Sequence, residues 1–190
     1  IKKMKIIKPT LLVLLLLINF KFYAQTKEDT IVDLFKYISK VDQTYLKKSK
    51  AFIRDQIFVN NFRIINDLID EGVLKKELLN SFSEKSVFKI DVGFHITFIH
   101  VFETAPNLIL NKDYIEFIEN EIVNNNFKKE FLVYPLSIYH FNMTYYQNDS
   151  LKKVENGKAR LIDHQYDALF YEALDRWGIE VSELKKKLGK

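Results

Sequence analysis

The chain contains no cysteine, and it is poor in the two residues that most often interrupt regular structure. Without cysteine it can form no disulfide and perform no thiol chemistry, so its stability must come from an apolar interior. Two prolines and five glycines follow residue 24, and this scarcity favours long regular elements over a loop-rich fold. The sequence also lacks a glycine-rich phosphate loop and a Gly-x-Ser-x-Gly turn, which excludes the commonest phosphate-binding and serine-hydrolase motifs.

A long membrane-spanning run is also absent. The unbroken apolar run from Leu11 to Ile18 is much shorter than the about 20 residues that a helix needs to cross a bilayer. Lysines without any acid precede it, and Ala24 follows it, which is the pattern of a secretory signal peptide. We therefore predict a signal over residues 1–24, cut after Ala24, and one domain over residues 25–190. An uncleaved signal anchor is the alternative.

The formal net charge of +4 lies mostly in this leader. Residues 1–24 hold five lysines, so 24 basic residues face 25 acidic ones in the remaining chain. Nucleic-acid binding needs a basic surface, so we expect no nucleic-acid partner. Nor do we expect stable membrane insertion after cleavage. The expected protein is bacterial and exported, periplasmic or extracellular, and a protein or a small molecule remains open as its partner.

Apolar residues recur at helical spacing over most of the chain. Ile53, Ile57, Ile64 and Leu68 form a second apolar face beside the Phe58 face, which predicts a helix packed on more than one side. Gly72 and Gly178 are expected stops, and Trp177 is an expected core anchor. The first predicted helix begins near Thr30. Further helices are predicted over residues 51–71, around 74–82, over 111–124 and 164–176, and in a short basic terminal segment from Ser182.

Two apolar segments, 87–102 and 131–146, allow a helix or a strand. In the first segment nearly all even-numbered residues are apolar, and this alternation is typical of a strand, although Gly93 could break it. Pro135 argues against a central strand in the second. We predict a mainly α, compact multi-helix domain, in which Asn156-Gly157 allows a small β-hairpin. The alternative is an α+β fold with strands at 87–102 and 131–146.

The chemistry-bearing candidates centre on His100. On a helix His100 and Glu103 share one face, which would suit acid–base catalysis, and Asp91 and His95 would share a face in the same way. Histidine binds transition metals, so His95, His100 and His140 are candidate ligands. No metal-binding motif supports them, however, and we expect no metal site and no cofactor. A satisfied polar histidine on an apolar face is the simpler interpretation of His100.

Several segments resemble an uncharacterised bacterial family of domains of unknown function that is found on exported proteins. They are Val41-Asp42-Gln43-x-Tyr45, the segment Asp55 to Gly72, Ile96-x-x-Ile99-His100 and Gly157-Lys158. The resemblance implies a mostly helical fold with a helix over 94–102, and it implies Asp42, Gln43 and His100 as the members of a polar site. This chain departs from the family at Leu46, where the family has arginine. It departs again at residues 160–163, which are Arg-Leu-Ile-Asp here and Tyr-Gly-Thr-Gln in the family.

The sequence therefore leaves open whether the protein is an enzyme. Because no catalytic motif is present, we expect a non-enzymatic binding or interaction protein that is exported. The alternative is a small metal-assisted or acid–base hydrolase centred on His100. The two differ in one geometric respect: the enzyme requires a second histidine or two carboxylates close to His100.

Overall fold

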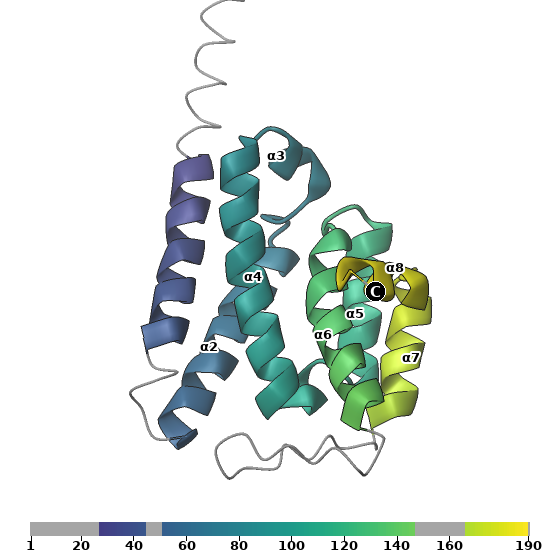
Figure 1. Cartoon of the computed structure of the whole chain (residues 1–190). Coiled ribbons are helices and arrows are strands. Elements are labelled where there is room, and N and C mark those ends of the chain that lie inside the picture. The colour runs from purple at the N-terminus through teal and green to yellow at the C-terminus, as the bar shows by residue number, and fades with distance from the viewer. Residues whose placement is uncertain (1–26, 45–50, 147–165, 190) are drawn as a thin grey trace, which may run out of the picture.

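Helices account for nearly all of the chain that the computed structural model describes, which comprises residues 27–44, 51–146 and 166–189 (Figure 1). The mainly α prediction is therefore confirmed. The Asn156-Gly157 hairpin lies outside the described residues. A helix over 27–44 comes first, and it is followed by α2 (Ala51–Asp70), α3 (Lys76–Asn80), α4 (Glu84–Thr104), the short 3₁₀ helix η1 (Pro106–Leu108), α5 (Lys112–Val123), α6 (Glu130–Tyr146), α7 (Asp167–Arg176) and α8 (Val181–Lys187).

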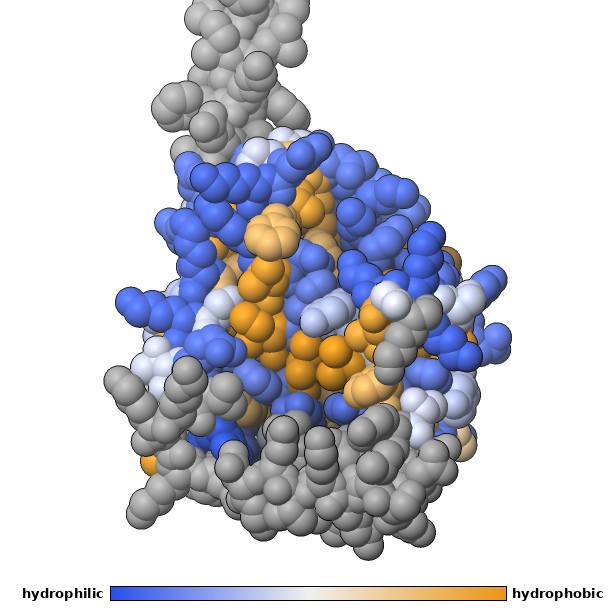
Figure 2. Space-filling model, viewed as in Figure 1, coloured by the Kyte–Doolittle hydropathy of each residue, from blue (hydrophilic) through white to orange (hydrophobic). Residues whose placement is uncertain are grey.

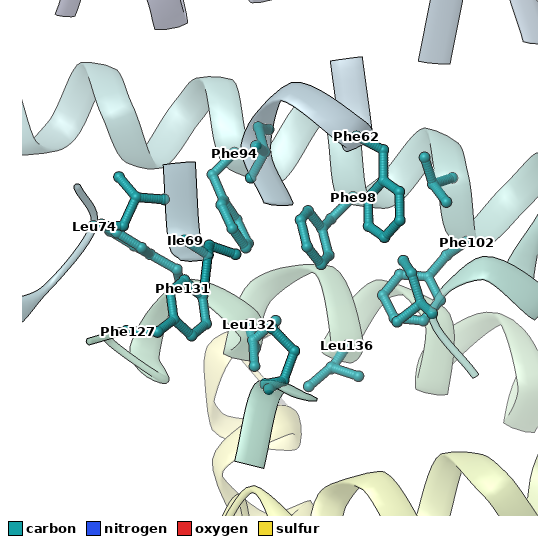
Figure 3. Packing of buried hydrophobic residues seen from close by; sticks show 14 of the residues in the cluster. Phe62, Ile69, Leu74, Phe94, Phe98, Phe102, Phe127, Phe131, Leu132 and Leu136 are labelled. Atoms are coloured by element: carbon teal, nitrogen blue, oxygen red, sulfur yellow. The ribbon is translucent and has the colours of Figure 1, made fainter. Parts of the chain in front are cut away.

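Helix α4 lies at the centre of the bundle. Helix 27–44 and α2 lie on one side of it, and α6 lies on the other, with α5, α7 and α8 packed beyond (Figure 1). Its buried face carries aromatic rings that stack along the core, with Phe94 and Phe98 4.0 Å apart between ring centroids and nearly parallel. Phe62 of α2 meets Phe98 edge-on at 5.3 Å, and Phe131 of α6 lies 5.5 Å from Phe94 (Figure 3). Such contacts bind three helices into one interior.

The α+β alternative is wrong, because both ambiguous segments are helical. Ile90, Phe94 and Phe98 alternate in sequence, but they are also four residues apart, so on a helix they share one buried face. Ser83 caps α4 by accepting a hydrogen bond from the Ser86 amide. Pro135 lies inside α6, where it removes one helical hydrogen bond at a cost of about 3 kcal/mol, which the surrounding packing must offset.

Two local predictions hold, and a third holds for some of its residues. Gly72 and Gly178 follow α2 and α7 with φ values of 63° and 62°, a left-handed conformation that glycine adopts without strain. Trp177 is 1% exposed, and its indole N–H donates to the Ile115 carbonyl over 3.0 Å, so it anchors α7 on α5. The second apolar face of α2 is not packed throughout: Ile57 and Leu68 pack against the core, but Ile53 is 48% exposed.

Helix 27–44 runs parallel to α4, and three contacts fix the register between them. At the start, Glu28 accepts hydrogen bonds from the Ser83 amide (3.0 Å) and hydroxyl (2.8 Å). Burial alone would raise the pKa of Glu28, but bonds from Ser86 and Ser83 outweigh it and hold that pKa below its usual value. Next, Phe35 packs against Gly93. Seven residues further along both helices, Asp42 meets His100.

Candidate functional site

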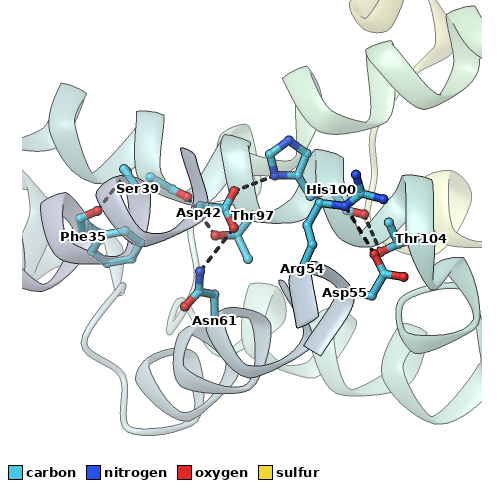
Figure 4. Close-up of polar contacts among 10 residues, drawn as sticks. Phe35, Ser39, Asp42, Arg54, Asp55, Asn61, Thr97, His100 and Thr104 are labelled. Atoms are coloured by element: carbon cyan, nitrogen blue, oxygen red, sulfur yellow. Dashed lines mark hydrogen bonds and ion pairs between the residues drawn. The ribbon is translucent and has the colours of Figure 1, made fainter. Parts of the chain in front are cut away.

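The candidate site is a buried polar cluster where helix 27–44, α2 and α4 converge. Asp42 is 0% exposed, and its two carboxylate oxygens have separate partners (Figure 4). One oxygen lies 2.5 Å from Nδ1 of His100, and the other accepts a hydrogen bond of 3.2 Å from the Asn61 amide group. Removing a carboxylate from water is costly unless its oxygens are paired, and here both are.

The surroundings of His100 hold its ring in one orientation. The ring stacks on Phe58 at 4.3 Å between centroids with an interplanar angle of 24°. With Asp42 ionised, its oxygens can only accept hydrogen bonds, so in that state Nδ1 carries the hydrogen and donates it to Asp42. This leaves Nε2 as the ring nitrogen available to another group. The His100 side chain is 11% exposed and that of Asp42 is fully buried, so any contact of this pair with solvent is made by His100 and not by the carboxylate.

The helix surfaces explain why these three residues meet. Asn61 interrupts the buried face that Phe58, Phe62 and Ile65 form on α2. His100 likewise interrupts the apolar buried face of α4 in its last turns. Asn61 and His100 would each lack a buried hydrogen-bond partner on their own helix. Because helix 27–44 runs parallel to α4, its Asp42 lies within hydrogen-bond distance of both. The polar interruptions are thus matched across three helices.

The predicted site residues separate in the structure. Asp42 and His100 are in contact, whereas the neighbouring Gln43 is exposed on the outer side of helix 27–44. Glu103 is also exposed, and the carboxylate found at Nδ1 of His100 is that of Asp42. Asn61 was not among the sequence candidates, although a polar residue on the apolar face of α2 was the available signal.

The other two candidate histidines occupy separate environments. His95 lies on α4 with its Nε2 3.0 Å from Asp91, at the predicted spacing of four residues, and it packs against Tyr134. His140 is buried in α6 beside Phe170. Burial lowers the pKa of His140, and the positive charge of Lys185 lowers it further.

Metal binding finds no prepared site among the residues that the structure describes. They contain no group of three histidine or acidic side chains placed to hold an ion. His100 offers one free nitrogen beside a single carboxylate that is already engaged on both oxygens. What this arrangement can do chemically is donate or accept one proton or one hydrogen bond at Nε2.

No helix within the described ranges is long and apolar enough to cross a membrane. Comparison of the chain with protein-family models, with curated proteins and with solved structures finds no match.

Proposed function

We propose that this chain is an exported bacterial protein that binds a partner without transforming it, and that His100 is the polar group its partner meets. The observation that carries the proposal is the 2.5 Å contact between the fully buried carboxylate of Asp42 and Nδ1 of His100, whose side chain is 11% exposed. Such a carboxylate fixes the tautomer and orientation of the ring, so that Nε2 presents one directed hydrogen bond. Orientation of a polar group in advance is what specific recognition requires.

Export is part of the same proposal, with residues 1–24 removed in the periplasm or outside the cell. The proposed cut after Ala24 lies before the first described helix residue, Lys27, so cleavage would remove none of the contacts described above. The bond from Ser83 to Glu28 would then secure the new N-terminal end of the protein. The fold thus suits a shortened chain.

Intact-mass measurement of protein recovered from the envelope of a Gram-negative host tests the export proposal. We expect the mass of residues 25–190, because the basic head, the short apolar run and Ala24 form a cleavable signal. The parallel measurement on protein from a host with the signal peptidase inhibited should give the full chain. Recovery of the full-length chain from the membrane in both cases would contradict the proposal.

An acid–base hydrolase centred on His100 is the second candidate. The same contact favours it, because a carboxylate bonded to Nδ1 leaves Nε2 free to take a proton from water or a hydroxyl group. The binding role is preferred because, among the described residues, one carboxylate is hydrogen-bonded to His100 and no three-ligand metal group exists. Likewise, no hydrogen bond joins Nε2 of His100 to a hydroxyl group of the described residues.

A thermal-shift screen of a library of polar small molecules and short peptides tests the role of His100. His100→Gln removes the imidazole, and His140→Gln is the matched control, since the two histidines are buried to the same degree, with whole-residue exposures of 9% and 8%. We expect compounds that raise the Tm of the wild type and of the control but not of His100→Gln. Compounds that stabilise all three proteins equally would contradict recognition by His100.

Hydrolysis of p-nitrophenyl acetate separates the two candidates. Under the binding role, the wild type and His100→Gln should release p-nitrophenol at the same rate. A wild-type rate more than about tenfold above that of His100→Gln would favour the hydrolase, because a positioned general base contributes at least about a hundredfold.

A further inference from the structure

A second feature lies apart from the Asp42–His100 cluster. A cavity of about 480 Å³ opens where α3, α4, α6 and α8 meet, and none of the residues that line it belongs to that cluster. Its size falls within the range of about 300–1,000 Å³ that is usual for small-molecule sites. Buried Leu79, Phe82 and Phe131 contribute to its lining beside charged residues, so its wall is partly apolar and partly polar.

An exposed ring stands at this cavity. Phe88 is part of the cavity lining, yet it is 65% exposed. Figure 2 shows apolar atoms open to solvent on the face that α4 and α6 present, bordered by hydrophilic ones. A large ring that the fold leaves in water next to a partly apolar hollow is suited to cover a bound apolar group.

The charges around the cavity favour a cation. Its lining contains three acids, Glu84, Asp91 and Glu130, against two lysines. Asp91 is paired with His95, but no ion pair joins Glu84 or Glu130 to a described basic side chain. Both of these carboxylates are exposed.

An aromatic face also attracts cations, and one example is already present. The ammonium group of Lys128 lies 5.9 Å from the centre of the Phe131 ring, within the range of a cation–π contact. Phe131 and the exposed Phe88 both line the cavity. Because Lys128 already occupies the Phe131 ring, the exposed Phe88 ring is the one that a ligand's positive charge could meet, together with the carboxylates of Glu84 and Glu130.

Anionic ligands are disfavoured because acidic side chains of the protein already lie at the N-termini of the two nearby helices, α4 and α6. The start of α4 is capped by Ser83, whose amide already donates to Glu28. The first turn of α6 contains Glu130. The positive ends of the two helix dipoles therefore face protein carboxylates rather than an open anion site.

We propose that this cavity is a binding site for a small amphipathic amine, with an apolar or aromatic body against Phe88 and its ammonium group toward Glu84 and Glu130. This site is additional to the role proposed for His100, and neither depends on the other. Failure of one experiment therefore leaves the other standing.

Titration with three probes of similar shape, followed by amide NMR, tests the site. The probes are 2-phenylethylamine, 3-phenyl-1-propanol and 3-phenylpropanoate, which are cationic, neutral and anionic at pH 7. We expect the amine to shift the amides of residues 79–91 and 128–131 and to bind about threefold to tenfold more tightly than the other two, as exposed ion pairs and cation–π contacts allow. Equal or tighter binding of the alcohol or the acid would overturn the assignment, as would shifts located elsewhere.

Variants with matched controls identify the contributing groups. The double variant Glu84→Gln, Glu130→Gln should abolish the preference for the amine, while Glu71→Gln, an exposed acid outside the cavity lining, should retain it. Phe88→Ala should lower the binding affinity for all three probes by about threefold. Tyr37→Ala is its control, because Tyr37 is 64% exposed but lies on helix 27–44, away from the lining. Glu84 and Glu130 are both exposed, so the double variant should fold. An unchanged preference for the amine in this variant would overturn the proposal.

Discussion

Replacing Asp42 by alanine is expected to lower the free energy of unfolding by about 2–6 kcal/mol, because it leaves two buried donors without an acceptor at about 1–3 kcal/mol each. The side chain is sealed from solvent and bonds both His100 and Asn61. Its removal leaves the Asn61 amide and the Nδ1–H of His100 without their acceptor inside the protein. Urea denaturation followed by circular dichroism at pH 7 measures the loss.

The matched control lies on the same helix. Asp33 is exposed and is paired only with Lys36, three residues away, so Asp33→Ala should leave stability nearly unchanged. A double-mutant cycle with His100→Ala should show a coupling between Asp42 and His100 of about 0.5–3 kcal/mol. Additive losses, or an Asp42→Ala variant as stable as Asp33→Ala, would show that the cluster contributes no coupled stabilisation.

Helix positions were largely predictable from this sequence because each depends on local features. The apolar spacing of α2 and α5 and the stops at Gly72 and Gly178 all follow from residues close in the chain. Segment 87–102 was ambiguous because α4 is apolar on several sides, so that residues two apart and residues four apart are both apolar. Packing on both flanks makes a central helix of this kind difficult to distinguish from a strand.

The pairing within the candidate site depends on information that is not local. The resemblance pointed to Asp42 and His100 as site members, but they lie 58 residues apart, and only the parallel register of their helices brings them together. Helical spacing instead suggested Glu103 as the partner of His100, since residues three apart share a face. Asn61 and the cavity at Phe88 depend on how whole helices pack, which periodicity within one helix does not specify.

The same register leads to the second large effect, at Gly93. Replacing Gly93 by alanine should destabilise the protein by about 1–3 kcal/mol, although alanine favours an isolated helix over glycine by about 1 kcal/mol. A Cβ atom added there would lie 2.8 Å from Cδ1 of Phe35, 3.0 Å from the Phe35 carbonyl oxygen and 3.0 Å from Oγ of Ser39. The side chains could rotate, but the carbonyl oxygen belongs to the backbone of helix 27–44, so the two helices must separate.

A series at this position distinguishes a steric effect from helix propensity. Gly93→Val should lose more stability than Gly93→Ala in urea denaturation, because it adds further atoms against the same backbone oxygen. The companion variant Ser39→Ala removes one of the three close contacts, so it should recover only part of the loss when combined with Gly93→Ala. A Gly93→Ala variant that is more stable than the wild type would show that helix 27–44 does not approach α4 this closely.

Separation of the helices should also reach the candidate site. Gly93 and His100 are two helical turns apart on α4, and Phe35 and Asp42 are two turns apart on helix 27–44, so the close approach at one level helps to set the distance at the other. In Gly93→Ala we therefore expect the ¹⁵N and ¹H resonances of the His100 imidazole to move toward those of Asp42→Ala, while the resonances of His140 on α6 stay in place. If the His100 resonances were unchanged in a destabilised Gly93→Ala variant, the close packing would stabilise the fold without holding the carboxylate against the imidazole.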